Sequence, residues 1–441
     1  MNQFKKLNNI VGWLVFIIAS TVYIITSEPT ASLWDCGEYI ATAYKLQVGH
    51  PPGAPFFQLL GNFFSLFAPS TAYVARMVNT MSALASGFTI LFLFWTITHF
   101  ARKIIIKEDK DFSTANTIAI IMSGVVGALA YTFSDSFWFS AVEGEVYAMS
   151  SFFTAVVFWA MLKWEEVADK RHGFRWLILI SYLVGLSIGV HLLNLLTIPA
   201  LIYIYYFKKY DPNFKGIFIS GFLSVVILGL IMYGVIPWVV IGAGWFERFF
   251  VNSIGLPFHW GTFFYFILVG VAIAYGIYYT QKNKKVVANT ILLGFTFLII
   301  GYSSFFILVI RSNANPPIDE NNPEDASSLL AYLNREQYGD RPLFYGENFV
   351  AAKNGLYDRS TASGDKSPVF TKSYCVVDEN NLESGTPYLT ETKVSRGLKK
   401  IFQYEDQAKA YIENSKDKNL SIKQAYVITD ERKGTVPHYM K

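Results

Sequence analysis

The sequence predicts an all-α, multi-pass membrane protein followed by a small α/β domain outside the membrane. Its 441 residues are 52% hydrophobic and only 16% charged, well below the roughly 25% charged residues of soluble domains. Apolar runs long enough to cross a bilayer recur along the first 310 residues, and lysine and arginine gather in alternate loops. We expect a transmembrane domain at 1–310 and an extracytoplasmic soluble domain at 311–441.

Apolar runs of bilayer length predict about nine membrane crossings. The first is expected to remain as a helix, because no signal-peptide cleavage site follows it. The run 176–207 has two interpretations, a tight hairpin of two short helices or one long tilted helix. Basic residues flank it on both sides, which favours the hairpin. The expected crossings lie near 10–26, 74–98, 115–133, 145–162, 176–190, 192–207, 217–241, 261–280 and 287–310.

The basic residues predict the orientation of the chain. One set of loops carries only Lys45, Arg76 and Arg248. Cytoplasmic loops carry the positive excess, so the N-terminus is expected in the cytoplasm. An odd number of crossings then places residues 311–441 on the opposite face. The basic residues of the predicted cytoplasmic loops are Lys5, Lys6, Arg102, Lys103, Lys107, Lys110, Lys163, Lys170, Arg171, Arg175, Lys208, Lys209, Lys215, Lys282, Lys284 and Lys285.

The first outer loop, residues 27–72, is too long for a simple turn and is expected to be structured. Apolar residues at helical spacing predict a helix over 32–47, which Gly49 would end. Pro51-Pro52 would hold His50 in extended chain. A second short helix is expected from Pro55 to Phe67 in the interface plane, because it is too short to span and too apolar for water.

Asp35 and Glu38 are three residues apart on the first of these helices and share one face. Two neighbouring carboxylates push their pKa values apart, and partial burial raises them, so one could act as a general base while the other orients or binds. The alternative has equal weight at this point. Asp35 would then be a helix N-cap and Glu38 a solvated acid.

The combined motifs resemble the GT-C class of membrane glycosyltransferases. The nearer resemblance is to a bacterial domain-of-unknown-function family related to the eukaryotic transmembrane protein O-mannosyltransferase, and it covers residues 1 to about 345. The motifs that carry it are Asp35-Cys36-Gly37-Glu38, His50-Pro51-Pro52-Gly53, Glu143-Gly144-Glu145-Val146-Tyr147, His191 and Ser312-Asn313-Ala314-Asn315-Pro316-Pro317.

This resemblance implies an inverting sugar transfer on the extracytoplasmic face of a bacterial inner membrane. The donor of the class is a polyprenyl-phosphate sugar, mannose-like here, and the acceptor is often a Ser or Thr hydroxyl of an exported protein. Asp35 matches the catalytic acid of the class and would be the general base. The C-terminal tail differs from the β-trefoil domain of some eukaryotic relatives, which puts acceptor recognition by that route in doubt.

His50 and four further residues are candidates for substrate binding. Glu143 and Glu145, in the outer loop with Tyr147, are costly near the hydrocarbon edge unless used or paired, and could bind sugar hydroxyls or a cation. His191 could hydrogen-bond the donor phosphate, although a satisfied core histidine is an equal alternative.

Two outer-face arginines are candidates for the donor phosphate, whose departure needs cationic stabilisation. Arg311 lies where the last helix meets the outer surface, and its alternative is an ordinary snorkelling anchor. Arg248 is the second candidate, in an aromatic loop that could flank an isoprenoid tail or form an aromatic belt.

The tail has a different composition from the preceding chain and predicts a small α/β domain. Helices are expected near 323–337 and 405–414, and strands near 342–346, 368–377 and 424–429. No closing element precedes Lys441, so an incomplete domain is expected. The two cysteines, Cys36 and Cys375, cannot form a Cys/His metal cluster, and neither a metal nor another cofactor is predicted.

Two other functions compete with this prediction. The same chemistry could act on a lipid or glycan acceptor, which the sequence does not distinguish. A transporter of lipid-linked sugars would need polar residues at mid-membrane, whereas the acids here gather at one face. Nucleic-acid binding is disfavoured, because the basic residues fit the inner membrane surface.

Overall fold

The computed structural model describes residues 2–107, 112–338, 367–381, 397–415 and 419–432, which fall into two compact units. The first unit comprises Met1–Val235 and Ile273–Glu320, and the second comprises Ile236–Ala272 and Asn321–Lys441. The units therefore interleave along the chain. The division at residue 310 stays a prediction about which part is embedded in the membrane.

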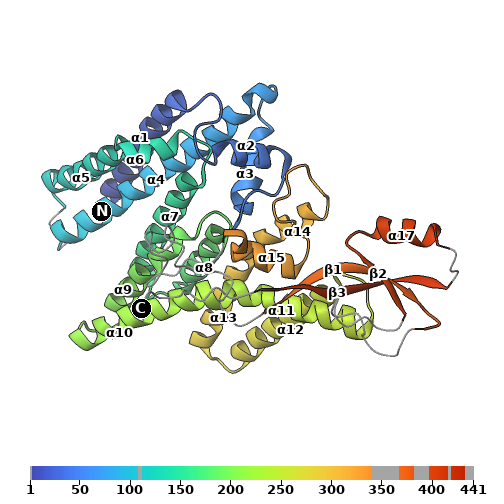
Figure 1. The fold of residues 1–441 in the computed structure, drawn as a ribbon. Helices are drawn as coiled ribbons and strands as arrows, with labels where there is room; N and C mark the ends of the chain where they lie inside the picture. Colours follow the sequence, from blue (N-terminus) through green and yellow to red (C-terminus); the bar gives the residue numbers. More distant parts are fainter. Residues whose placement is uncertain (1, 108–111, 339–366, 382–396, 416–418, 433–441) are drawn as a thin grey trace, which may run out of the picture. The chain divides into compact units, whose positions relative to one another are not determined.

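Seven helical runs are long and apolar enough to cross a membrane, and the chain is a multi-pass membrane protein (Figure 1). They correspond to predicted crossings, with the run Phe214–Ile254 interrupted by π-helical turns at Leu230–Val235 and Phe250–Ile254. Their helices are α1 (Asn2–Thr26), α4 (Val74–Ile105), α5 (Thr114–Thr132), α7 (Val146–Val167), α10 (Phe214–Gly229), α11 (Ile236–Phe249), α12 (Trp260–Lys282), α13 (Val286–Tyr302) and α14 (Phe306–Ser312).

The apolar run around His191 forms two shorter helices rather than one long one. Helix α8 (Phe174–Ile188) ends at Gly189, a 3-10 turn covers Leu192–Thr197, and α9 (Ile198–Lys209) follows. Both helices fall below the length that spans a bilayer without distortion. Nine crossings therefore stay a prediction, and seven is the number that length and composition support among the described residues.

The core of the first unit lies where α1 and α5 pack on α4. Its fully buried side chains include Ala19, Tyr23, Ile90, Phe94 and Ala128. The Tyr23 hydroxyl donates to the carbonyl of Thr132 (2.9 Å), so the one polar atom of this large ring is satisfied. This packing fixes the ends of α4 and α5 and, with them, the loop that follows α5.

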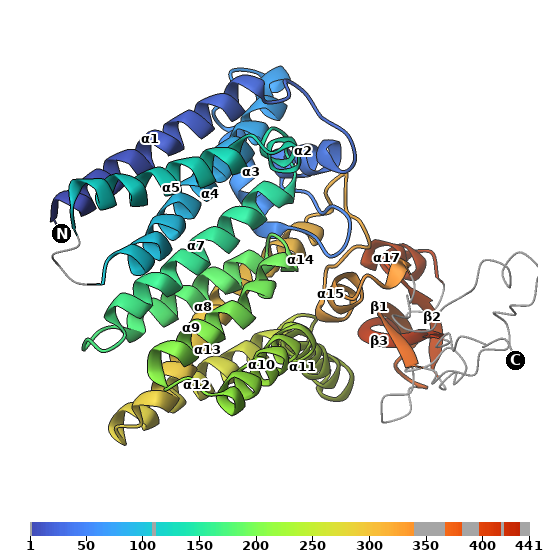
Figure 2. The same cartoon turned by 90° about the vertical axis from the view of Figure 1, so that its left-hand side faces the viewer.

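The first outer loop folds into two short helices, α2 (Cys36–Lys45) and α3 (Pro55–Ser65), as predicted. Both pack on the ends of α4 and α7 through a cluster that contains Ile40, Phe57, Val78 and Met149. Figures 1 and 2 place α2 and α3 at the end of the first unit opposite the N-terminus. A third short helix, α6 (Asp135–Ala141), precedes α7.

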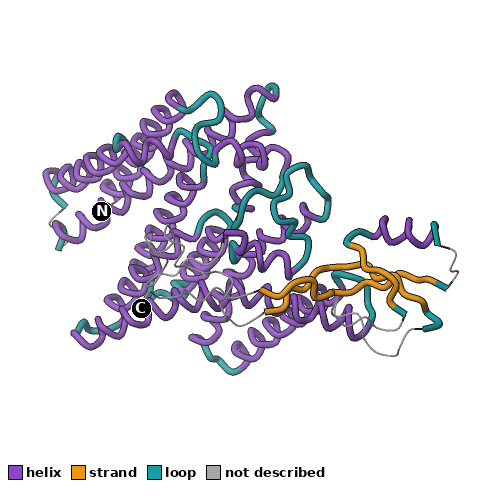
Figure 3. Tube along the Cα trace, in the orientation of Figure 1, coloured by secondary structure: helices purple, strands orange, loops and turns teal. Residues whose placement is uncertain are grey.

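The second unit contains an antiparallel sheet of order β2-β1-β3 (Figure 3). Its strands are β1 (Ser367–Asp378), β2 (Leu398–Phe402) and β3 (Leu420–Arg432), and its further helices are α15 (Ala326–Leu333) and α17 (Glu405–Glu413). The predicted helices and the strands near 368–377 and 424–429 are confirmed. Strand β2 was not predicted, and the strand expected near 342–346 lies outside the described residues.

Candidate active site

His50 lies between the two acids of the first outer loop. Its Nδ1 atom is 3.0 Å from Glu38 Oε2, and its backbone N–H donates to Glu38 Oε1 (2.5 Å). Its Nε2 atom is 3.7 Å from Asp35 Oδ2. The three residues therefore form one cluster, and Glu38 is not the solvated acid of the alternative interpretation.

The pKa values of this cluster follow from its contacts. The hydrogen bond to Glu38 raises the pKa of His50, although burial opposes it. Burial alone would raise the pKa of Glu38, but the hydrogen bonds from His50 lower it below the ordinary value. Asp35 is the most exposed of the three, with 56% of its side chain accessible. An accessible carboxylate beside an imidazole with a raised pKa suits a group that must meet a substrate.

Local sequence explains how His50 reaches Glu38. Helix α2 ends at Lys45 rather than near Gly49, because Leu46 adopts a left-handed conformation (φ 47°). Gly49 then passes so close to Glu38 that an added Cβ would lie 2.5 Å from Glu38 Oε1. Gly53, with φ 72°, closes a turn onto the His50 carbonyl (2.9 Å).

Glu143 and Glu145 are both buried beside this cluster, with exposed fractions of 4% and 6%. Burial, assisted by the charges of Asp35 and Glu143, raises the pKa of Glu145 to about 7, although backbone N–H groups at the start of α7 oppose the shift. Burial and the Glu143 carboxylate raise the pKa of Cys36 to about 12. One oxygen of Glu143, Oε2, is buried without a hydrogen-bond partner.

Tyr147 and His191 lie side by side in the first unit, with ring centroids 5.6 Å apart. The Nδ1 atom of His191 accepts the backbone N–H of Leu193 (3.1 Å). That bond fixes the neutral tautomer, in which Nε2 carries the proton and is a donor. Tyr147 is half-exposed, and its hydroxyl is a second donor or acceptor on this side.

Asn79 fixes the start of the loop and was missed by the sequence analysis. Its side chain on α4 is fully buried and donates to the carbonyls of Glu28 (2.7 Å) and Thr30 (3.0 Å). Gly144 packs against it, since an added Cβ would lie 2.8 Å from Asn79 Oδ1. A polar residue within an apolar helix is the only signal that could have identified it.

Glu320 is a third acid near His50 that sequence reasoning also missed. Residues 318–320 return to the first loop, where Val48 N–H donates to the Ile318 carbonyl and Glu320 N–H to the Val48 carbonyl (both 3.1 Å). Burial and the charge of Glu38 raise the pKa of Glu320, and its own charge contributes to the raised pKa of His50. No local pattern predicts this contact, because 271 residues separate the paired positions Val48 and Asp319.

Arg311 holds the end of helix α2. Its Nε atom donates to the Leu46 carbonyl (2.5 Å) and an Nη atom to the Lys45 carbonyl (3.3 Å). Carbonyls at a helix C-terminus lack intrahelical partners, so these bonds satisfy them and fix α2. This contact neither requires nor excludes the predicted role in phosphate binding, which stays a prediction.

Arg248 belongs to the second unit and lines a polar cavity of about 470 Å³ there. Its guanidinium lies 4.6 Å from the Phe370 ring centroid and donates to Ser327 Oγ (3.3 Å). All the other predicted site residues lie in the first unit. The proposed link between Arg248 and a donor phosphate therefore stays a prediction.

The first-unit cluster can perform acid–base chemistry on a bound hydroxyl. It offers an exposed carboxylate (Asp35), an imidazole with a raised pKa (His50), and a buried carboxyl that titrates near neutrality (Glu145). Environments that push neighbouring pKa values apart are typical of catalytic sites. All three residues lie on segments outside the candidate membrane spans.

Sequence comparison places most of this cluster in a known domain. Residues 35–213 match the sequence profile of the protein O-mannosyl-transferase TMEM260 N-terminal domain. The chain is 26% identical over 231 residues to protein O-mannosyl-transferase tmem260 of Dictyostelium discoideum, covering 50% of this chain and 26% of that protein. It is 25% identical over 174 residues to protein O-mannosyl-transferase TMEM260 of Mus musculus, covering 40% and 22%.

The chain thus spans about a quarter of the length of these relatives. No solved structure matches it. All the motifs from Asp35 to His191 that carry the predicted resemblance lie within the matched range. The resemblance of this chain to the family of membrane protein O-mannosyl-transferases typified by TMEM260 is therefore confirmed over residues 35–213.

Proposed function

We propose that the protein is an inverting glycosyltransferase that moves a mannose-like sugar from a polyprenyl phosphate to a Ser or Thr hydroxyl of an exported protein. The observation that carries this proposal is the cluster in which His50 contacts both Asp35 and Glu38 beside a buried Glu145. The related proteins are named protein O-mannosyl-transferases, which supports a sugar as the group transferred and a protein as its acceptor.

In the proposed reaction Asp35 accepts the proton of the acceptor hydroxyl. The hydroxyl oxygen attacks the anomeric carbon from the face opposite the phosphate, so the new C–O bond forms as the bond to phosphate breaks. The polyprenyl phosphate leaves with the electron pair, and the configuration inverts. His50 holds Glu38 and presents its Nε2 side to Asp35.

Donor groups suited to the phosphate and sugar lie beside Asp35. His191 Nε2–H and the Tyr147 hydroxyl are donors, and Tyr147 is close enough to Asp35 for the two to interact electrostatically. Arg311 is the first-unit arginine that we propose for the phosphate. Glu143 and Glu145 are suited to sugar hydroxyls, because a buried carboxyl oxygen without a partner favours a hydrogen-bond donor. Such contacts would orient the anomeric carbon toward the acceptor.

An apolar groove supports a lipid-linked donor. It has a volume of about 700 Å³ and is lined by α4, α5, α7 and the 3-10 turn after His191. Ser151 and Leu193 line it, and they lie one helical turn beyond Tyr147 and two residues beyond His191. An isoprenoid tail in this groove would place its phosphate near these two side chains.

The membrane orientation belongs to the same proposal. We place the active site on the extracytoplasmic face of a bacterial inner membrane, with the N-terminus in the cytoplasm. The structure of the first unit supports this orientation, because α2 and α3 lie at the opposite end from the N-terminus (Figure 2). Labelling of single cysteines introduced at Asp135 and Lys170 would test it, and a cytoplasmic Asp135 would contradict it.

The direct test compares exported proteins from cells with and without this gene by mass spectrometry. We expect hexose on specific Ser or Thr residues to disappear when the gene is deleted and to return with the wild-type chain. Purified protein incubated with polyprenyl-phosphate mannose and an exported substrate should restore the modification. Loss of a lipid or glycan product, with exported proteins unchanged, would contradict a protein acceptor.

A further inference from the structure

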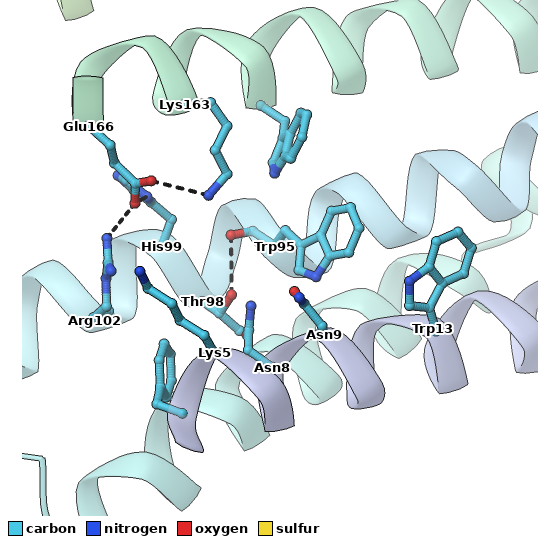
Figure 4. Close-up of a pocket in the computed structure, with 12 residues that line it drawn as sticks. Lys5, Asn8, Asn9, Trp13, Trp95, Thr98, His99, Arg102, Lys163 and Glu166 are labelled. Atoms are coloured by element: carbon cyan, nitrogen blue, oxygen red, sulfur yellow. Dashed lines mark hydrogen bonds and ion pairs between the residues drawn. The ribbon is translucent and has the colours of Figure 1, made fainter. Parts of the chain in front are cut away.

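A second polar pocket lies at the opposite end of the first unit from Asp35, between α1, α4 and α7 (Figure 4). Its volume is about 410 Å³. Its lining includes Lys5 and Asn8 from α1, Trp95 and Arg102 from α4, and Lys163 and Glu166 from α7. None of these residues takes part in the proposed sugar transfer, so the pocket needs a separate explanation.

Among the residues that the structure describes, the cluster around this pocket carries more positive than negative charge. Glu166 pairs with both Arg102 (2.6 Å) and Lys163 (3.3 Å), and Glu165 pairs with Lys103. With Lys5 this makes four cations against two carboxylates, an excess of two positive charges even when His99 is neutral. Such an excess between helices attracts an anion.

Lys5 is the cation that the surrounding ion pairs do not explain. Pairs between α4 and α7 have an ordinary structural interpretation, because they tie two neighbouring helices together. Lys5 comes from α1, is exposed, and makes no hydrogen bond or ion pair with another residue that the structure describes. In Figure 4 its side chain extends from α1 toward Arg102.

Unsatisfied polar atoms in the same pocket also indicate a ligand. Within the described chain, Trp95 Nε1 and Asn8 Oδ1 are buried without a hydrogen-bond partner. His99, only 7% exposed, is already paired, with Nε2 3.4 Å from Glu165 and Nδ1 3.5 Å from Glu166. Leaving a buried polar group unpaired is unfavourable, so two such atoms in one pocket favour a bound partner. An indole N–H can only donate, which suits an oxyanion.

The geometry points to a binding site for a phosphate group, supplied by the headgroup of an anionic phospholipid. The pocket lies at helix ends that carry lysine and arginine, the depth at which lipid phosphates lie. Trp13 and Trp159 also line it, and tryptophan is enriched at this level of a membrane. The volume exceeds that of a phosphate ion and leaves room for the glycerol of a headgroup.

Thermal unfolding of the purified full chain with added lipid tests this proposal. In phosphatidylcholine nanodiscs, we expect added phosphatidylglycerol to raise the unfolding temperature and native mass spectrometry to retain bound phosphatidylglycerol. Lys5→Ala should weaken the apparent lipid affinity at least about fivefold. The matched control is Lys6→Ala, since Lys6 is also exposed on the same helix but does not line the pocket.

A second variant separates ligand binding from structural support. Trp95→Phe removes the unpaired N–H but keeps an aromatic ring, so the lipid-free protein should be as stable as the wild type or more so. Its response to phosphatidylglycerol should nevertheless fall. An equal response of wild type, Lys5→Ala and Lys6→Ala would overturn the proposal.

A third measurement, with inorganic phosphate added alone, distinguishes a lipid headgroup from a soluble phosphate compound. A shift at low millimolar phosphate that Lys5→Ala abolishes would assign the site to a soluble phosphate compound. No shift with phosphate, together with a Lys5-dependent response to phosphatidylglycerol, would assign it to the lipid. These measurements read binding and not transfer, so their failure leaves the proposed glycosyltransferase function unaffected.

Discussion

Glu38 accepts two contacts from His50, one from the backbone N–H at 2.5 Å and one from ring Nδ1 at 3.0 Å. The ring is thereby turned so that its other nitrogen faces Asp35. Glu38 and His50, twelve residues apart in two motifs, are thus held together by hydrogen bonds. The roles of the neighbouring acids follow from this arrangement.

Asp35→Asn should abolish the proposed sugar transfer, because an amide cannot accept the acceptor proton. We expect a loss of at least about 100-fold in kcat, in the range for removal of a general base. Transfer to an acceptor peptide would be measured with purified protein. Asp135→Asn is the control, since Asp135 is an exposed acid of another loop. Retained activity in Asp35→Asn would exclude Asp35 as the base.

The contacts of His50 predict a pH dependence of stability. The folded-state pKa of His50 is raised, so its contribution is fully present below the unfolded value of about 6.5 and is lost as pH rises through the folded pKa. The lowered pKa of Glu38 gives the opposite sign, with a contribution lost as pH falls below about 4.3. Wild type should therefore exceed His50→Gln in stability most clearly near pH 6.

Thermal unfolding from pH 4 to pH 9 would measure this difference. The exposed His172, replaced in His172→Gln, serves as the control and should leave the profile unchanged. A constant difference between wild type and His50→Gln across this range would refute the assigned contact between His50 and Glu38.

Glu145 should make the folded protein less stable as pH rises from about 4.5 to about 7. Its pKa in the folded state is about 7, above the ordinary value of 4.5, so its contribution is fully present below about pH 4.5 and is lost as pH rises from there through 7. The shift corresponds to about 3 kcal/mol. Glu145→Gln should remove this dependence and be relatively more stable at pH 8. The control Glu28→Gln should keep the wild-type profile.

Gly49→Ala should disrupt the cluster, because the new Cβ would lie 2.5 Å from Glu38 Oε1. We expect a loss of roughly 1–3 kcal/mol in unfolding free energy and reduced transfer. Gly37→Ala is a matched control in the neighbouring motif, where the Cβ would meet only Ala31 Cβ at 3.8 Å. If both variants had the same stability and activity, the Glu38 side chain could move away from the new Cβ without loss, and its contact with His50 would not be required.

Arg311→Ala should raise the KM for the lipid-linked donor more than the KM for the acceptor, if its guanidinium reaches the phosphate. The variant also removes the bonds to Lys45 and Leu46, so a loss of stability is expected in either case. Arg311→Lys keeps the charge and should recover donor affinity in part. An unchanged donor KM in Arg311→Ala would confine this residue to holding α2.

Local patterns predicted much of the fold and the motif part of the site. Apolar run lengths predicted α1, α4, α5 and α7, and the spacing of apolar residues predicted α2. The residues of the His-Pro-Pro-Gly motif and the acids beside it were identified directly. The expected extended chain at His50 was wrong, because Gly53 closes a turn onto the His50 carbonyl, and the contact between His50 and Glu38 was not predicted. Motifs within one loop leave a signature in a single stretch of sequence.

Contacts between distant segments could not be predicted in this way. Glu320 reaches the cluster only because residues 318–320 pair with Val48, and the raised pKa of Glu145 depends on burial by several helices. The end of α2 was predicted near Gly49 but lies at Lys45, where Arg311 satisfies the terminal carbonyls. The pocket at Lys5 combines three helices and has no linear motif.

The pairing of Val48 with Asp319 imposes an order on biogenesis. The segment that borders His50 emerges from the ribosome early, whereas its partner follows the last helical run of the first unit. The acid cluster is therefore completed only after that run has been inserted. A nascent chain that stops before residue 318 would carry every motif of the first loop but would lack the segment that completes the cluster around His50. The cluster therefore cannot act before the last helical run of the first unit has been inserted into the membrane.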